Sequence, residues 1–446
     1  YTDAGIVPRS RLKDGAPASV HALGGSAPFQ TLVFAAHAGF ALALLVGYRT
    51  RLAAFATCFL VHSLHVRNPY VLQGGDGVLR LLLFWGMFLP LGARWSLDAR
   101  HDPGPGPRRT LSVPTAAFTL QVSFVYWFSV LLKTAPEWRA DGTAVYYALN
   151  VDPLTTDLGR WLLGFPDLLR VLTHATFWFE VVGPALLFAP VFRPQLRTAA
   201  VFAFLGFHLV GLNACMHLGP FPYVCGAAWV ALLPGAFWDR LAAWRGRPPG
   251  TTARGVIGAP LAVNLMAAVL LVYVILWNVR STDPARLRVV LPQSLNPVGF
   301  GLGLDQYWAM FAPRPPKDDG WYVCGAELQD GEVVDLLRDG APLTWAKPGR
   351  VAAHYPNERW RKYMMNLCRP DQEANRAALA NYMWDRWNRS HPPGRQVREL
   401  RLYYMLERTP PPGGPATRPT PVLLTHRSAA ALPVCPDPDE PTGGPD

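Results

Sequence analysis

The sequence predicts a polytopic α-helical membrane bundle followed by a C-terminal α+β domain. Half of the 446 residues are apolar and only 16% are charged, whereas soluble proteins carry about a quarter charged residues. Between residues 28 and 278 the charges gather in short clusters separated by largely uncharged stretches. After Arg280 the charge density rises to the level of a soluble protein, so the main domain boundary is expected there.

Eight apolar segments are candidate membrane spans, because a helix needs about 20 apolar residues to cross the hydrocarbon core. They cover residues 28–48, 52–67, 76–92, 113–133, 171–192, 197–217, 221–238 and 256–278. The second and third are short. The eighth carries no charge between Val256 and Trp277 and is the clearest of the eight.

Arginine placement predicts the orientation of these spans. Basic residues concentrate in the odd-numbered loops, at positions 49, 51, 94, 100, 108, 109, 193, 197, 240, 245, 247 and 254. Loops rich in Lys and Arg face the cytoplasm. The segment 1–27 and the whole C-terminal region are therefore expected on the opposite, exoplasmic face.

The region after the helices separates into a soluble domain at 279–408 and a Pro- and Gly-rich tail at 409–446. Short runs at 321–324, 333–337 and 398–406 have strand character, and residues 376–387 have a helical pattern. The tail is expected to be extended or disordered. Cys324 and Cys368 are candidates for a disulfide if this domain faces an oxidising compartment.

Two functional classes are not favoured by the composition. The net charge of +11 is spread over short loops. Because the sequence has no basic patch interleaved with aromatic residues, nucleic-acid binding is not predicted. The six cysteines include no CxxC pair, and no metal site is predicted.

Lys133 is the leading catalytic candidate. The chain has five lysines among 42 basic residues, and Lys133 alone lies in the helical half. A desolvated lysine can give up its proton and act as a base, which arginine cannot do. The alternative is a lysine that anchors the outer helix end by reaching toward water.

Other ionisable residues in the helical half have both structural and functional interpretations. His62 and His65 share one helix face, but a third metal ligand is missing, so polar packing is favoured. Asp76 and Arg80 are four residues apart and can pair locally. Glu180 needs a buried partner, for which Arg80 or a histidine is expected.

Several segments resemble bacterial proteins with the HTTM domain, the prokaryotic relatives of vitamin K-dependent gamma-carboxylase. They are RNPYVLQGGDG at 67–77, LPLG at 89–92, SLD at 96–98, KTAPEW at 133–138, the spans 174–188 and 208–223, QYWAMFAP at 306–313 and RWRKY at 359–363. The resemblance covers nearly the whole chain except the tail. The opening YTDAGIVP looks like the segment after the family's first span, which implies one more helix upstream and nine in the full protein.

The resemblance implies a carboxylase-like lyase activity. In the carboxylase, a lysine at the position of Lys133 deprotonates a reduced naphthoquinone (vitamin K or menaquinol). Oxygen then generates a strong base, which removes a proton from substrate glutamate for attack on carbon dioxide. By this resemblance the catalytic residues would be Lys133, His65, Glu180 and His208, and the quinol would lie near Asn68, Tyr70, Trp127 and Trp138.

One departure from the carboxylase pattern is Pro69, which stands where carboxylases have a histidine, with His65 one turn earlier. Two functions therefore stay open: an enzyme using Lys133 on a quinol or other lipid-phase substrate, and a non-catalytic membrane protein that binds a lipid or peptide. The expected surroundings are the lipid bilayer of the inner (plasma) membrane, with a peptide or protein as a further substrate.

Overall fold

The computed structural model describes residues 1–446 except 13–18, 102–108, 246–255, 288 and 430–446. The chain divides into two compact units. The helical unit comprises Tyr1–Asp319, Asn357–Lys362 and Thr409–Ala416, and the sheet unit comprises Gly320–Pro356, Tyr363–Arg408 and Thr417–Asp446. The helical unit thus extends about 40 residues beyond the boundary that the charge density suggested, because the segment after its last long helix folds back onto it.

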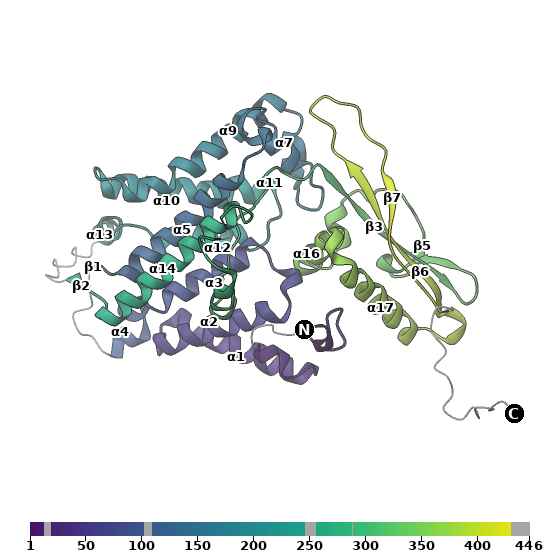
Figure 1. Ribbon diagram of the computed structural model, residues 1–446, viewed down its shortest axis with the longest axis horizontal. Coiled ribbons are helices and arrows are strands. Elements are labelled where there is room, and N and C mark those ends of the chain that lie inside the picture. The colour runs from purple at the N-terminus through teal and green to yellow at the C-terminus, as the bar shows by residue number, and fades with distance from the viewer. Residues whose placement is uncertain (13–18, 102–108, 246–255, 288, 430–446) are drawn as a thin grey trace. The chain divides into compact units, whose positions relative to one another are not determined.

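Each of the eight expected spans coincides with helix in the helical unit (Figure 1). The longer helices are α1 (Ala27–Val46), α2 (Thr50–Arg67), α3 (Gly74–Gly86), α5 (Val113–Leu132), α9 (Pro166–Val182), α10 (Arg193–Leu205), α12 (Phe221–Val230), α13 (Gly235–Trp244) and α14 (Leu261–Thr282). Shorter elements are α4 (Leu97–His101), α6 (Pro136–Arg139), α7 (Ala144–Leu149), α8 (Asp157–Leu162), α11 (Asn213–Cys215), α15 (Asn296–Leu302), β1 (Arg109–Thr110) and β2 (Val256–Ile257).

Five helical segments in the described chain are long and apolar enough to cross a membrane: Ala27–Val46, Val113–Leu132, Pro166–Phe188, Arg193–Cys215 and Leu261–Thr282. A sixth is possible if α12 and α13, which meet at an angle of 83°, count as one broken span. Helix α3 has only 13 residues, too few for the hydrocarbon core. The structure therefore supports a membrane protein with five or six crossing helices, and not the full count of eight.

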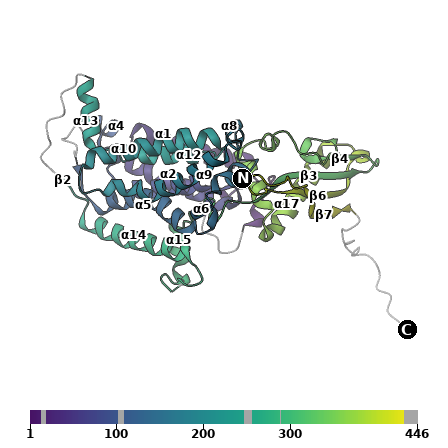
Figure 2. The same cartoon turned by 90° about the horizontal axis from the view of Figure 1, so that it is seen from above.

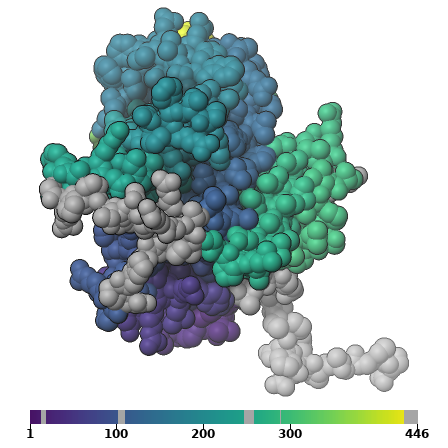
Figure 3. Space-filling model, turned by 90° about the vertical axis from the view of Figure 1, so that its left-hand side faces the viewer, coloured from purple at the N-terminus to yellow at the C-terminus, as the bar shows by residue number. Residues whose placement is uncertain are grey.

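Helix α5 lies at the centre of the bundle, next to α3, α9 and α14 (Figure 1; Figure 2). Its neighbour α14 has an apolar outer face, on which Leu261, Leu265 and Val269 are 74%, 59% and 68% exposed. Figure 3 shows the green surface of the α14 region to one side of the blue and teal helices. Such a face is expected to contact lipid, because exposing a continuous apolar stripe to water is unfavourable.

The sheet unit contains a five-stranded sheet with the strand order β5-β4-β3-β6-β7. Its strands are β3 (Asp318–Leu328), β4 (Val333–Asp335), β5 (Ala341–Pro342), β6 (Val397–Arg408) and β7 (Thr420–Ser428). Its helices are α17 (Glu373–Ser390) and the second half of α16 (Glu358–Leu367), whose first half belongs to the helical unit. The α+β architecture confirms the expected class. The run 333–337 is strand only as far as Asp335, where a 3-10 turn begins.

Two expectations for the C-terminal region can be compared with the structure. Residues 420–428, expected to be extended or disordered as part of the tail, are extended and form the strand β7, which pairs antiparallel with β6. The structure contains no disulfide between Cys324 and Cys368: the first is buried in β3 and the second is exposed at the end of α16. Residues 430–446, including Cys435, lie outside the described residues.

Asp335 fixes the turn that ends β4, and its removal should destabilise the sheet unit. Its buried carboxylate accepts hydrogen bonds from the backbone N–H groups of Cys324 (3.2 Å) and Leu337 (3.0 Å). Asp335→Ala should cost about 2–4 kcal/mol in thermal or chemical unfolding, because both N–H groups lose a buried acceptor. Asp385→Ala is the control: this side chain is exposed within α17, so its loss should change stability by less than about 0.5 kcal/mol.

The Asp335 effect should also depend on pH. Burial raises the pKa of this carboxyl, so the native protein binds the proton more tightly than the unfolded chain. The stability that the Asp335 carboxyl contributes is then fully present below the ordinary carboxyl pKa. It is lost as pH rises through the raised pKa of the folded state. Asp335→Ala should therefore cost more at pH 4 than at pH 7, and an equal or smaller cost at pH 4 contradicts this account.

Candidate functional site

Lys133 caps the C-terminal end of α5 and is buried. Its backbone N–H donates to the carbonyl oxygens of Ser129 (3.1 Å) and Val130 (3.0 Å), which closes the last turn of the helix. Pro136, three residues later, starts the short helix α6, so the chain turns sharply after Lys133. The residue is only 2% exposed. Lys133 is therefore not a lysine reaching toward water.

The partner of the Lys133 ammonium is Glu180, near the C-terminal end of α9. The Nζ atom makes an ion pair and a short hydrogen bond with Glu180 Oε2, and both side chains are nearly inaccessible to solvent. The expectation that Arg80 or a histidine would pair with Glu180 is therefore wrong. Two buried opposite charges compensate each other's desolvation, so the pair fixes α5 against α9.

Trp138 covers the other side of the amine. The Lys133 Nζ lies 4.4 Å from the centre of the Trp138 ring, close enough for a cation–π contact. The indole N–H of Trp138 donates to the carbonyl oxygen of Phe311 (2.8 Å), and Arg139 Nε donates to the carbonyl oxygen of Lys133 (3.0 Å). These bonds hold α6 over the ion pair. The Lys133 ammonium is thus enclosed by a carboxylate and an indole face.

Trp127, predicted to lie near a quinol, is on the same side of the bundle. Its indole N–H donates to the carbonyl oxygen of Val181 (3.1 Å), the residue after Glu180. Its ring packs against Phe188, with 5.9 Å between the ring centres. Because the N–H groups of Trp127 and Trp138 are both occupied by backbone oxygens, these indoles offer only their ring faces to a ligand.

A second ion pair, between a buried glutamate and a partly exposed lysine, was not found from the sequence. Glu137, in the same motif as Lys133, is 3% exposed, and its Oε1 lies 2.6 Å from the Lys317 Nζ. Burial alone would raise the pKa of Glu137, but the hydrogen bond from Lys317 holds it below its ordinary value. The same contact raises the pKa of Lys317. The scarcity of lysine, which singled out Lys133, is a signal that also applies to Lys317.

His208 belongs to a hydrogen-bonded chain in the bundle core. It lies in a π-helical turn, Gly206–Leu212, a distortion often found at functional sites. Its Nε2 is 2.7 Å from the hydroxyl of Tyr126, which also accepts a hydrogen bond from the indole N–H of Trp229 (2.7 Å). The Tyr126 oxygen accepts from that indole, and the direction of its hydrogen bond with His208 follows the tautomer of the histidine.

His65 belongs to a different cluster, at the junction of α2 and α3. Its Nε2 lies 3.9 Å from Asp76 Oδ1, and Asp76 makes two hydrogen bonds with Arg359, of 2.6 and 2.7 Å. Arg80 instead pairs with Asp305 at 3.0 Å. The expected local pair of Asp76 with Arg80 is therefore wrong.

Asn68 and Tyr70, the other two predicted quinol contacts, lie in the connection between α2 and α3. The Oδ1 atom of Asn68 is buried and has no hydrogen-bond partner among the described residues. In the described part of the chain, no hydrogen bond or ion pair joins Lys133 to His65, Asn68 or His208. Of the predicted residues, the structure thus brings together Lys133, Glu180, Trp138 and Trp127.

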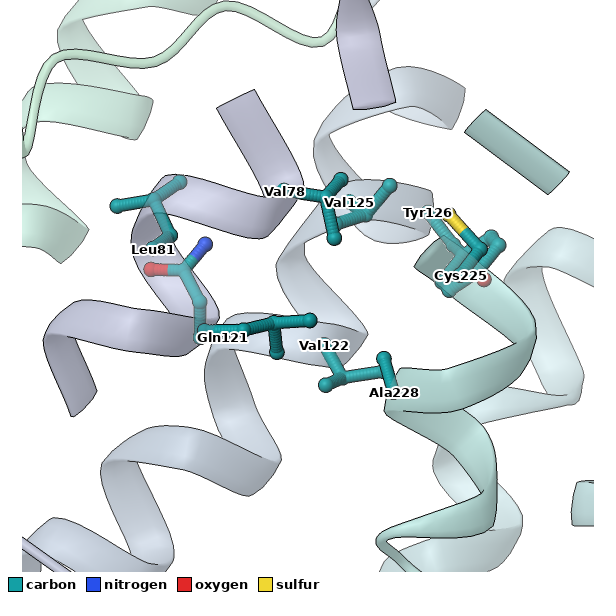
Figure 4. A pocket seen from close by; sticks show the side chains of 9 residues that line it. Val78, Leu81, Gln121, Val122, Val125, Tyr126, Cys225 and Ala228 are labelled. Atoms are coloured by element: carbon teal, nitrogen blue, oxygen red, sulfur yellow. The ribbon is translucent and has the colours of Figure 1, made fainter. Parts of the chain in front are cut away.

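A small cavity lies in the core between α3, α5 and α12 (Figure 4). It has a volume of about 10 Å³ and is lined by apolar side chains together with Gln121, Tyr126 and Cys225. This is about the space that one water molecule needs. The cavity is therefore too small for a quinone ring. Within the described ranges, no group of three or more His, Cys, Asp or Glu side chains could hold a metal ion.

The Lys133–Glu180 pair should behave as one energetic unit. Lys133→Met or Glu180→Gln alone should destabilise the purified protein by about 3–5 kcal/mol, because each leaves a buried charge or a buried polar group without its partner. The double variant should recover most of that loss. Thermal unfolding in detergent gives the comparison. Lys347→Met, which breaks the solvent-accessible pair with Glu407, is the control and should cost less than about 1 kcal/mol. Additive losses in the double variant contradict the assignment.

Comparison with known proteins identifies the helical region. Residues 21–235 match the family model of the HTTM domain. The matched range contains Lys133, Glu180 and His208, and it ends before α14 and the sheet unit. Comparisons with curated proteins and with solved structures gave no match. From residue 21 to residue 235, this chain is an HTTM domain.

Proposed function

We propose that this HTTM domain is an enzyme in which Lys133 and Glu180 form the acid–base pair. Its substrate would be an acidic O–H group of a lipid-phase molecule, a reduced naphthoquinone in a carboxylase-like (lyase) reaction. The supporting observation is the buried Lys133–Glu180 pair covered by Trp138. Ionisable residues are costly inside a membrane protein, and those that persist there are commonly functional.

The pair offers a route by which a buried lysine can become a base. In the observed arrangement Glu180 stabilises the ammonium form of Lys133. Transfer of one proton from the ammonium to the carboxylate leaves a neutral amine and a neutral carboxylic acid, which a dry site tolerates better than isolated charges. The amine can then accept a proton from an O–H group placed against it, and the resulting ammonium supplies the counter-charge to the anion that forms.

The residues around the amine suit a phenolic ring. The Trp138 ring lies against the Lys133 amine, and Trp127 is bonded to the residue after Glu180. Neither indole N–H remains available for hydrogen bonding. A flat aromatic ligand could stack on such faces with its hydroxyl directed at Lys133. When bound, a reduced naphthoquinone would supply the acidic hydroxyl and the reaction with oxygen. Asn68, Tyr70 and His65 belong to the other cluster and have no part in this contact.

The setting of the reaction is part of the same proposal. The bilayer would deliver the quinol to the apolar helices, and a peptide or protein would be the second substrate. The arginine pattern supports an inner-membrane location with the sheet unit on the non-cytoplasmic side.

Replacement of Lys133 by arginine separates an enzyme from a non-catalytic binding protein. Lys133→Arg keeps a cation for Glu180, so the protein should fold with nearly the wild-type melting temperature, but arginine cannot serve as a base. Turnover should fall by about 10²–10⁴-fold, the usual contribution of a general base. The assay is oxidation of a reduced naphthoquinone by the protein in nanodiscs, with labelled bicarbonate and a glutamate-containing peptide.

Lys347→Arg is the matched control. It makes the same chemical change at an ion pair in the sheet unit and should leave turnover unchanged. If Lys133→Arg turns over quinol at the wild-type rate, Lys133 is not a base. The alternative function, a non-catalytic membrane protein that binds a lipid or peptide, would then be preferred.

A further inference from the structure

The four arginine-rich loops of the helical unit meet at one end of it. The carboxylate of Asp98, in the third loop, accepts a hydrogen bond from the backbone N–H of Arg49 in the first (2.8 Å). Strand β1 of the third loop pairs with β2 of the seventh. Beside the fifth loop, Arg197 donates to the carbonyl oxygen of Leu232, which follows α12. The loops that the sequence grouped by their charge therefore share one face of the protein.

Helix α13 runs across this face instead of continuing the direction of α12. Its 10 residues meet α12 at an angle of 83°, and they span about 15 Å, half of a hydrocarbon core. Figure 2 shows α13 turned across the direction of α10 and α12. Trp238 packs on Trp95 of the third loop, with 5.4 Å between the ring centres, and Phe237 packs on Phe202 of α10 at 5.8 Å. These contacts hold α13 against the ends of the other helices.

One side of α13 is an apolar stripe that ends in an exposed tryptophan. Phe237, Leu241 and Trp244 follow each other at intervals of four and three residues, so they lie on one face of the helix. Phe237 and Leu241 are half-buried, whereas Trp244 is 81% exposed. A tryptophan left outside the protein core is typical of the boundary between lipid headgroups and acyl chains, where its ring is buried and its N–H stays hydrated.

The charges of this face would attract an anionic surface. Around the helix, Arg240 and Arg245 border the apolar stripe on either side, and Asp239 lies opposite it. Both arginines are exposed, and neither makes an ion pair with another described residue. In the sequence, the four loops hold twelve arginines but only three acids, Asp98, Asp102 and Asp239. The face is therefore strongly basic.

The helices that end at this face indicate that the anionic partner is a lipid bilayer. Helix α1 ends here, and Leu42 and Leu45 in its last turns are exposed. Helix α5, another of the crossing helices, begins here after β1. Because the exposed apolar surface stops where the arginines begin, the arginines stand at the level of the lipid headgroups. The apolar stripe of α13 lies at the same level.

We propose that α13 is an interfacial helix that binds anionic phospholipid headgroups on the face formed by the odd-numbered loops. Trp244 enters the headgroup region, and Arg240 and Arg245 bind the lipid phosphates on either side of it. The planar guanidinium suits this task, since it can contact two phosphate oxygens at once. On this account α12 and α13 are not one broken span. Lys133 closes the other end of α5, so the lipid site does not depend on the proposed reaction.

Hydrogen–deuterium exchange of the full chain in nanodiscs tests this proposal on the wild type. One nanodisc contains phosphatidylcholine alone, and the other an equal mixture with phosphatidylglycerol. Exchange in peptides covering Gly235–Trp244 should be roughly 10-fold slower in the mixture, the reduction in the open population when lipid is present at about ten times its Kd. High salt should abolish the difference, because it screens the arginines from the phosphates.

Arg240→Gln/Arg245→Gln tests the phosphate contacts. Affinity for phosphatidylglycerol should fall by roughly 10-fold or more, because each basic residue beside an anionic bilayer strengthens binding about fivefold. Most of the difference in exchange should then disappear. Arg386→Gln/Arg389→Gln is the matched control: it removes two exposed arginines from α17 and should keep the difference. Trp244→Ala should speed exchange of α13 in both nanodiscs, since its anchoring does not depend on lipid charge.

Two results would overturn the proposal. Equal exchange of wild-type α13 in both nanodiscs would mean that the helix does not recognise lipid charge, as expected if α12 and α13 crossed the membrane together. A difference that persists in folded Arg240→Gln/Arg245→Gln, or in the wild type at high salt, would place the lipid effect elsewhere. Should the double variant fail to fold, the wild-type salt series decides.

Discussion

A buried ammonium group needs a counter-charge, and this requirement organises the centre of the HTTM domain. Lys133 ends the most buried long helix, and Glu180 comes from the neighbouring α9. In a medium of low dielectric constant, neither charge could remain without the other. The pair therefore fixes the rotation of both helices, and with it the position of the α6 turn whose Trp138 covers the amine. The indole faces of the site follow from the same contact.

The described charges of the helical unit are neutralised in distinct ways, which separates structural from functional candidates. Asp76 and Arg80 each have an oppositely charged partner, Arg359 and Asp305, as expected of residues that hold segments together. Lys133 and Glu180 are paired but covered by the Trp138 ring, an environment suited to proton transfer.

Sequence reasoning located the helices and the key lysine but not their partners. Apolar length and turn residues are local properties, so every expected span coincided with helix, although α3 proved too short to cross a membrane. Composition identified Lys133 because lysine is rare in this chain. Glu180 is 47 residues away from Lys133, and their contact depends on how two helices rotate against each other, which apolar patterns leave open. Lys317 and Arg359 pair across still longer separations, through segments that fold back onto the helical unit. The π-helical turn at His208 has no sequence signature that we could use.

The most direct test of the central claim is the identity of the lipid-soluble molecules that co-purify with the protein. Mass spectrometry of organic extracts should compare the wild type with the Lys133→Met/Glu180→Gln double variant, in which both charges are replaced together. If the buried pair and its indole faces form a quinol site, a naphthoquinone should accompany the wild type and be depleted from the variant. Phospholipid alone in both extracts, or equal naphthoquinone in both, would contradict the account.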